Sequence, residues 1–328
     1  MHDDELRAGD LVEVKSAREI LATLDDRGSL EGLPFMPEML AQLGRRLVVR
    51  ARAERICDTI HYLGSMRMQR AVVLGDLRCD GSGHDGCEAE CVLFWKEAWL
   101  RKAAAGAPEA VAAAEDPYRA ELAGRVAAGS WARAPREGEP ACYCCQATEL
   151  VRASERVRLA DPRPYLRVLQ SGSVPLGRFL RVLGRAAVVE ALNKLGRVPA
   201  VHLAGPQAAP IPSPPLGLRA GDWVEVRSRE EIRQTLSPKG RNRGLWFDRE
   251  MLAFCGRRFR VRRRVSRIVD ERDGRMIHLK SDCIMLEGVV CSGENSLSRW
   301  FCPRAIYSYW RESWLKPVEA PPEAGSGR

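Results

Sequence analysis

The 328-residue sequence contains no run of about 18 uncharged apolar residues, the length that a membrane-spanning helix needs. It opens on MHDDELRAGD, so it also lacks the basic start and apolar run of a secretory signal. We therefore expect a cytoplasmic protein with no transmembrane span.

The motifs of common catalytic sites are missing too. The sequence has no glycine-rich nucleotide loop with its lysine, no serine nucleophile elbow and no helix with two metal-binding histidines. Paired CxxC knuckles, the strongest signal for structural zinc, do not occur either. Function therefore has to be inferred from the cysteine-rich and arginine-rich stretches of the sequence.

Cysteine and positive charge are in excess. The 11 cysteines are an odd number, which a complete set of disulfides cannot use, and in a reducing cytosol clustered cysteines are more often metal ligands or reactive thiols. A net charge of +9 favours acidic partners such as nucleic acid, phosphorylated ligands or anionic lipid, although a basic surface also keeps a protein soluble.

An internal repeat organises the chain. LRAGDLVEVKSAREI begins at Leu6 and LRAGDWVEVRSREEI begins at Leu218. The copies end on FWKEAWLRK and YWRESWLKP, after a three-residue insertion in the second. We predict two homologous domains, residues 5–102 and 217–317, around an unrelated middle segment, residues 103–216, with a disordered tail over residues 318–328.

Each copy has the pattern of a short β-rich domain. LVEV and WVEV alternate apolar and polar residues, and Ser16 with Glu19 suits a capping box before a short helix. Pro37 or Asp248 suits the start of a second helix, and the runs LVVRARAERI and FRVRRRVSRIV alternate as half-buried strands do. CEAECVLFWKEAWLRK and CPRAIYSYWRESW, which close the copies, have the composition of C-terminal helices.

These patterns predict an α+β fold of two homologous small β-barrel-like domains with short helices, joined by a helical, cysteine-containing middle segment. The short strands, tight turns and GD-V-V opening resemble the small barrels of the Src-homology and KOW type. As a whole the repeat resembles uncharacterised bacterial proteins encoded beside specialised-metabolite pathways. That resemblance implies an accessory role in a biosynthetic pathway and supplies no activity.

The middle segment has linker-like ends. Residues 103–140 are Ala-rich, and HLAGPQAAPIPSPPLG, ending at Gly217, is a stiff proline-rich spacer. Residues 175–195 have the pattern of a basic amphipathic helix. Such a helix packs its apolar face on its own domain, or makes a peripheral contact with an anionic membrane or a partner.

The stretch LRCDGSGHDGCEAEC, residues 77–91, concentrates candidate metal donors. If a helix begins near His84, then His84, Cys87 and Cys91 lie along one helical face, and Cys79 closes the set from the incoming strand. Three thiols and one imidazole are a donor set that tetrahedral structural zinc accepts. The alternative is that Cys79 and Cys87 are small buried residues and His84 is a turn residue.

CDGSGH also resembles the CDGSH iron–sulfur proteins, which implies that Cys79 and His84 are ligands of a [2Fe–2S] cluster. Gly83 is an extra residue relative to that motif, and no C-x-C stands upstream of it. Zinc is therefore ranked first.

The second copy keeps only half of the donor set, because Arg299 and Ile306 replace the histidine and the last cysteine. Six further cysteines are candidates for packing or for additional metal or redox sites: Cys142, Cys144 and Cys145 of the CYCC segment, and Cys283, Cys291 and Cys302 of the second copy.

The most basic stretch is GRRFRVRRRVSR, residues 256–267, on a predicted strand. Its candidate anion-binding residues are Arg257, Arg258, Arg260, Arg262, Arg263 and Arg264. Phosphate contacts from such a strand would give nonspecific, salt-sensitive nucleic-acid binding. A solvated strand face is the simpler interpretation.

The leading prediction is a cytosolic metal-binding interaction or scaffold protein, with zinc held by Cys79, His84, Cys87 and Cys91 and with basic surfaces that recognise an acidic partner protein or a phosphorylated ligand. A redox or tailoring metalloenzyme that uses a [2Fe–2S] centre or the CYCC thiols is the second class. A nonspecific nucleic-acid binder is the third.

Overall fold

The computed structural model describes residues 5–61, 64–104, 116–134, 136, 139–194, 203–209, 214–295 and 299–320. It divides into two compact units. The first unit comprises Met1–Lys194, Arg267–Ile277 and Ser292–Ala305, and the second comprises Leu195–Ser266, His278–Cys291 and Ile306–Arg328. The first unit therefore holds the first repeat, most of the middle segment and two segments of the second repeat. Parts of both predicted linkers, and residues 321–328 of the predicted tail, lie outside the described residues.

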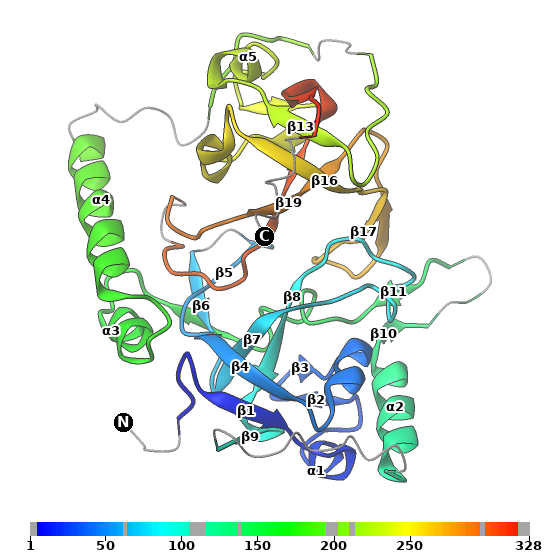
Figure 1. The fold of residues 1–328 in the computed structure, drawn as a ribbon. Helices are drawn as coiled ribbons and strands as arrows, with labels where there is room; N and C mark the ends of the chain where they lie inside the picture. The colour runs from blue at the N-terminus through cyan, green and yellow to red at the C-terminus, as the bar shows by residue number, and fades with distance from the viewer. Residues whose placement is uncertain are drawn as a thin grey trace, which may run out of the picture. The chain divides into compact units, whose positions relative to one another are not determined.

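The first unit is built on an antiparallel five-stranded sheet, a half-barrel in which the strands are ordered β8-β7-β4-β1-β9 (Figure 1). In chain order its strands are β1 (Leu11–Val14), β4 (Arg46–Arg52), β7 (Ala71–Arg78), β8 (Val92–Lys96) and β9 (Leu100–Lys102). Val12 lies opposite Leu47 on one side and Lys102 on the other, and its side chain is fully buried. The alternating pattern of the sequence predicts this strand correctly.

Three smaller sheets lie wholly within the first unit, and a fourth lies in it except for its last residue, His278. The three are β12-β6-β5 (Glu155–Val157, Ser65–Arg67, Ile56–Cys57), β2-β3 (Ser29–Leu30, Leu33–Pro34) and β10-β11 (Trp131–Arg133, Cys142–Tyr143). The fourth, the hairpin of β17 (Arg267–Val269) and β18 (Met276–His278), turns at Gly274, whose φ is +75°.

The second unit repeats the five-stranded topology, in the order β20-β19-β16-β13-β21. Figure 1 labels its three central strands, β19, β16 and β13. Its strands are β13 (Trp223–Val226), β16 (Arg258–Arg264), β19 (Ile284–Val290), β20 (Tyr307–Trp310) and β21 (Leu315–Pro317), beside the short pair β14-β15 (Arg241–Asn242, Leu245–Trp246). Val224 lies opposite Phe259 and Pro317, the register that Val12 has in the first sheet. The observed class is α+β with two antiparallel half-barrel sheets.

Short helices connect the strands. The predicted capping box of Ser16 with Glu19 forms before α1 (Ala17–Leu21), and Ser228 with Glu231 forms the same box before α5 (Arg229–Arg233). The predicted second helices are 3-10 helices, η1 (Pro37–Gln42) and η3 (Arg249–Phe254). The middle segment contributes α2 (Tyr118–Gly129), α3 (Arg163–Gln170) and α4 (Leu176–Lys194). None of the helices in the described part of the chain is long and apolar enough to cross a bilayer.

The prediction that each copy ends in a C-terminal helix is wrong. Those residues form β8 and β20, each followed by a single 3-10 turn, η2 (Glu97–Trp99) or η4 (Glu312–Trp314). Phe94 and Trp95 lie opposite Val73 and Val72 of β7. Cross-strand burial of these aromatic side chains outweighs the helix propensity of the neighbouring Ala and Glu residues.

The two units have the same aromatic core. In the first, the Phe35 ring meets Trp99 edge-on at 5.1 Å. In the second, Phe247 meets Trp314 in the same way at 5.3 Å. All four side chains are essentially fully buried, which stabilises each sheet through a large apolar area.

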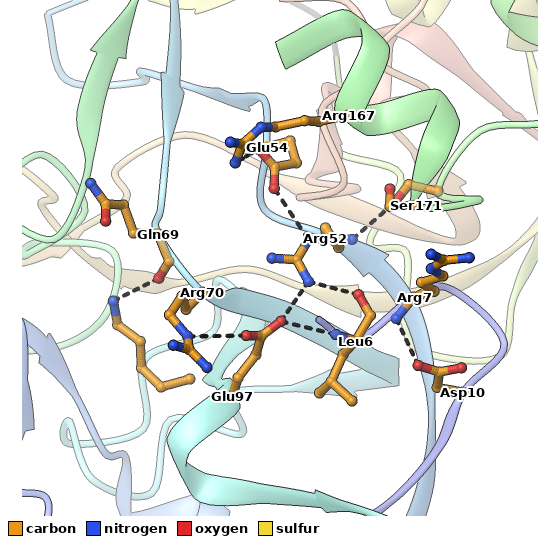
Figure 2. Close-up of polar contacts among 12 residues, drawn as sticks. Leu6, Arg7, Asp10, Arg52, Glu54, Gln69, Arg70, Glu97, Arg167 and Ser171 are labelled. Carbon is orange, nitrogen blue, oxygen red and sulfur yellow. Dashed lines mark hydrogen bonds and ion pairs between the residues drawn. The ribbon is translucent and has the colours of Figure 1, made fainter. Parts of the chain in front are cut away.

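A buried ion network holds the entry into β1 (Figure 2). Glu97 Oε1 accepts from Arg52 Nη1 at 2.5 Å and from the Leu6 backbone N–H at 3.2 Å, while Arg70 Nε reaches Glu97 Oε2 at 3.3 Å. Arg52 also donates to Glu54 at 3.1 Å. The second unit has the same arrangement of contacts, because Glu312 accepts hydrogen bonds from the Leu218 N–H at 3.0 Å and from Arg264.

Candidate metal centre

The predicted zinc-binding stretch is a compact loop between β7 and β8. It opens where the Cys79 N–H donates to the Cys91 carbonyl at 2.8 Å, and it turns where the N–H groups of His84 and Gly86 donate to the Gly81 carbonyl at 3.0 and 2.9 Å. The Cys87 N–H then donates to the His84 carbonyl at 3.1 Å. These turns bring residues that are up to twelve positions apart to one end of the sheet.

The helix predicted from His84 to Cys91 does not form. Gly81, Asp85, Gly86 and Glu90 have φ values of +78°, +49°, +69° and +48°, which no right-handed helix contains. The glycines adopt this conformation without strain, and the Asp80 side chain closes the first turn by accepting from the Ser82 N–H at 2.8 Å. The donors are therefore gathered by a turn structure and not by helical spacing.

Three donor atoms come together at this loop. Glu38, Cys79 and His84 each offer one ligand atom, and these atoms all lie within 4.8 Å of one another. The Cys79 thiol donates to Glu38 Oε1 at 3.0 Å. The second carboxylate oxygen, Glu38 Oε2, is buried and has no hydrogen-bond partner. Glu38 is held in place by η1, and it was not among the residues predicted from the sequence.

His84 is oriented for ligation. Its side chain is buried, and its Nε2 lies 3.2 Å from the Cys144 carbonyl, which can only accept a hydrogen bond. Nε2 therefore carries the proton, and the lone pair of the neutral ring is on Nδ1. Burial lowers the pKa of His84 and outweighs the opposing charge of Glu38, so the imidazole is in the neutral form that a metal requires.

The remaining predicted ligands line the same small cavity. Its volume is about 40 Å³, and its walls include Cys79, Cys87, Cys91 and Cys145, together with His84. Cys79 comes directly after Arg78 and Cys91 directly before Val92, which are paired, so the two cysteines are opposed across the ends of β7 and β8. Directly opposed residues of an antiparallel pair have Cβ atoms about 5 Å apart. Cys87 is engaged otherwise, because its Sγ accepts from the Val269 N–H at 3.3 Å.

Cys145 reaches the cavity because the CYCC segment is fixed to the first sheet by Gln146. The buried Gln146 amide donates to the carbonyls of Phe94 and Pro34 at 2.9 and 3.0 Å and accepts from the Phe94 N–H at 2.7 Å. This clamp places Cys145 and the Cys144 carbonyl beside the loop of the first repeat. The sequence offers CYCC as a source of extra ligands, but it contains no signal that identifies Gln146.

The thiols of the cavity are protonated in the absence of a cation. Burial, followed by the charge of Glu38, raises the pKa of Cys79 far above its ordinary value. Burial, followed by the charge of Glu271, likewise raises the pKa of Cys91, and burial raises the pKa of Cys145 to about 11. A bound cation would reverse this preference, because metal ligation stabilises the thiolate.

The corresponding loop of the second copy lacks this group. The Cys291 N–H donates to the Ile306 carbonyl at 2.7 Å, as Cys79 does to Cys91, so the strand ends have the same geometry with one thiol fewer. Cys283 is buried in the second unit. Over the ranges that the structure describes, no second set of three candidate donors lies as close together as Glu38, Cys79 and His84.

The other predicted site residues have local partners. Cys142 Sγ lies 3.2 Å from Arg133 Nη2. Five of the six candidate arginines have partners in the second unit. Arg257, just before β16, and Arg262 lie over the rings of Phe259 and Tyr307. Arg258 pairs with Glu225, Arg260 donates to the Gly221 carbonyl, and Arg264 pairs with Glu312. Most of this strand's charge is therefore engaged within its own unit.

Comparison of the chain with protein-family models, with curated proteins and with solved structures gives no match.

Proposed function

We propose that this chain is a metal-binding interaction or scaffold protein whose first unit holds one zinc ion. Glu38, Cys79 and His84 are the proposed ligands, and Cys91 is the proposed fourth. The second unit, which contains most of the second repeat, would bind no metal.

The observation that carries the proposal is the buried, unpartnered Glu38 Oε2 beside a thiol and a neutral imidazole. A buried carboxylate oxygen without a hydrogen bond or a cation is costly, on the order of 1–3 kcal/mol or more. A divalent cation would remove that cost and would deprotonate Cys79, whose only described acceptor is the same carboxylate. Carboxylate, thiolate and imidazole together form a mixed donor set that zinc accepts.

The surroundings favour a structural ion. A cavity of about 40 Å³ has room for an ion and one or two water molecules, and not for a large substrate. Cys91 faces Cys79 across the strand ends and would close a four-ligand site. The hydrogen bond from His84 to the Cys144 carbonyl is the kind of outer contact that orients a metal-binding histidine. The ion would then join the β7–β8 loop, η1 and the CYCC segment.

The test is metal analysis and a visible spectrum on anaerobically purified full-length protein. About one zinc per chain is expected, with no visible absorption, and both Glu38→Gln and His84→Ala should lose the ion. Glu250→Gln is the matched control, since Glu250 holds the position of Glu38 in η3 and should leave zinc content unchanged. Iron with sulfide and visible bands would replace this proposal with the [2Fe–2S] alternative, and a metal-free wild type would contradict both.

The basic surface of α4 supports an acidic partner protein. Leu176, Leu180 and Val188 are 57%, 60% and 58% exposed, and Arg181 and Arg185 are exposed on the same helix. The helix is nonetheless anchored, because Phe179 stacks on Phe301 at 5.1 Å. Retention of the full chain on immobilised poly-glutamate should fall in an Arg181→Gln, Arg185→Gln double variant. Equal retention of the two proteins, or binding to phosphatidylserine vesicles alone, would contradict this proposal.

A further inference from the structure

A second pair of cysteines in the first unit contains none of the proposed zinc ligands. Cys57 ends β5, and Cys302 lies in the Ser292–Ala305 segment that belongs to the same unit. The Cys57 N–H lies 3.2 Å from Cys302 Sγ, although 245 residues separate the two. The thiol side chains are also hydrogen-bonded to each other.

Arginine side chains fix this pair in place. Arg304 Nη1 lies 3.8 Å from Cys57 Sγ and donates to the Cys57 carbonyl at 3.2 Å and to Thr59 Oγ1 at 2.8 Å. Arg304 Nη2 donates to Glu271 at 3.1 Å. The backbone that carries Cys302 is held as well, because Arg55 donates to the Trp300 carbonyl at 3.1 Å. The two sulfurs are therefore kept adjacent by contacts that do not involve a metal.

The electrostatic surroundings favour a charged sulfur at Cys57. The hydrogen bond from Cys302, helped by the charge of Arg304 and opposed by burial, lowers the pKa of Cys57 to about 6. The cavity thiols Cys79, Cys91 and Cys145 are shifted the opposite way. Cys302 is half-buried, whereas Cys57 is only 5% exposed, so a reagent that reaches the pair has to be small.

We propose that Cys57 and Cys302 form a hydroperoxide-reactive dithiol, in which Cys57 is the thiolate that is oxidised and Cys302 is the thiol that resolves it. The Cys57 thiolate attacks the terminal oxygen of the hydroperoxide, the O–O bond breaks, and the leaving oxygen takes up a proton as an alcohol or water. Cys57 is then a sulfenic acid.

Cys302 completes the reaction. Its sulfur loses a proton and attacks the Cys57 sulfur, the S–O bond breaks and water leaves. In sum, two thiols and one hydroperoxide give one disulfide, one alcohol or water from the peroxide, and one further water. The disulfide would join Ser292–Ala305 covalently to β5, and an added dithiol would reverse it. None of the proposed zinc ligands takes part in these steps, and Arg304 and Glu271 line the cavity of the proposed zinc site as well.

The experiment treats full-length protein of known zinc content with one equivalent of hydrogen peroxide. The protein is then unfolded in N-ethylmaleimide, digested and analysed by mass spectrometry. A peptide pair linked through Cys57 and Cys302, lost on adding dithiothreitol, is the expected product. In Cys302→Ser, dimedone should label Cys57, and in the control Cys255→Ser the linked pair should form as in the wild type.

The pH dependence tests the role of Arg304. The rate of peroxide oxidation of Cys57 should reach half its maximum near pH 6 in the wild type, and Arg304→Gln should raise that midpoint, because it removes a positive charge that favours the thiolate. An unchanged midpoint would remove Arg304 from the proposal. Oxidation of other cysteines while Cys57 and Cys302 stay labelled by N-ethylmaleimide would overturn it, and that result needs no variant to fold.

Discussion

The thiol of Cys79 donates a hydrogen bond to Glu38 Oε1 at 3.0 Å, across 41 residues of sequence. The contact joins a 3-10 helix near the start of the first repeat to the loop at its end. It also leaves the other carboxylate oxygen of Glu38 buried and unpartnered. Several consequences of this arrangement, and of the fold that supports it, can be measured.

Cys91 and Cys87 should differ in their importance for zinc. Cys91→Ser removes the proposed fourth ligand and should weaken zinc affinity at least tenfold, whereas Cys87→Ser should change it little, because Cys87 Sγ is engaged by the Val269 N–H. Competition with a chelator measures both affinities. The opposite ranking would mean that Cys87, and not Cys91, completes the site.

Gly81 should be essential to the geometry of the loop. At φ +78° any other residue is strained, and a Cβ would also collide with the Cys87 carbonyl. Gly81→Ala should therefore lose zinc. Gly75→Ala is the matched control, since Gly75 has φ +47° with open space around it, and it should lose about 1–2 kcal/mol of stability while retaining zinc. Full zinc content in Gly81→Ala would show that the loop tolerates rearrangement.

The depressed pKa of Cys57 predicts a pH dependence of stability. The thiolate is favoured in the folded state, so this group contributes most above its unfolded pKa of about 9, and the contribution is lost as the pH falls through about 6. The difference in unfolding free energy between wild type and Cys57→Ser should rise from pH 6 to pH 9, by at most about 1.4 kcal/mol per pH unit. Urea unfolding under reducing conditions gives this difference, and a flat profile would contradict the thiolate assignment.

The ion network at the start of β1 should be strongly coupled. Arg52→Met leaves Glu97 buried without its main partner and should cost about 3–5 kcal/mol, whereas Arg52→Met with Glu97→Leu should cost clearly less than the sum of the single changes. Arg264→Met should cost less in the second unit, because the Arg264 side chain is 40% exposed and that of Arg52 only 3%. Chemical denaturation of the four variants measures each term, and additive costs would argue against coupling.

Much of the fold follows from local sequence signals. The LVEV and WVEV strands and the Ser16–Glu19 capping box form as predicted, because each depends on residues within a few positions of one another. The alternating runs that become β4 and β16 form for the same reason, and α4 follows its helical pattern.

The closing strands were predicted as helices for a physical reason. Helix propensity is a local property, whereas the burial of Phe94 and Trp95 against β7 depends on a partner strand about 20 residues earlier in the chain. That tertiary pairing outweighs the preference of isolated residues.

The sequence by itself determined that candidate donors are concentrated between Cys79 and Cys91, and it contains two similar stretches that begin at Leu6 and Leu218. Only the tertiary structure decided which atoms meet. Turns with positive φ, and not helical spacing, gather Cys79 and His84, while η1 supplies Glu38 and the Gln146 clamp brings Cys145 to the same cavity. Cys57 and Cys302 meet across 245 residues in the same way. Spacing along a chain constrains only near neighbours, and contacts between distant residues exist only after the sheets have packed.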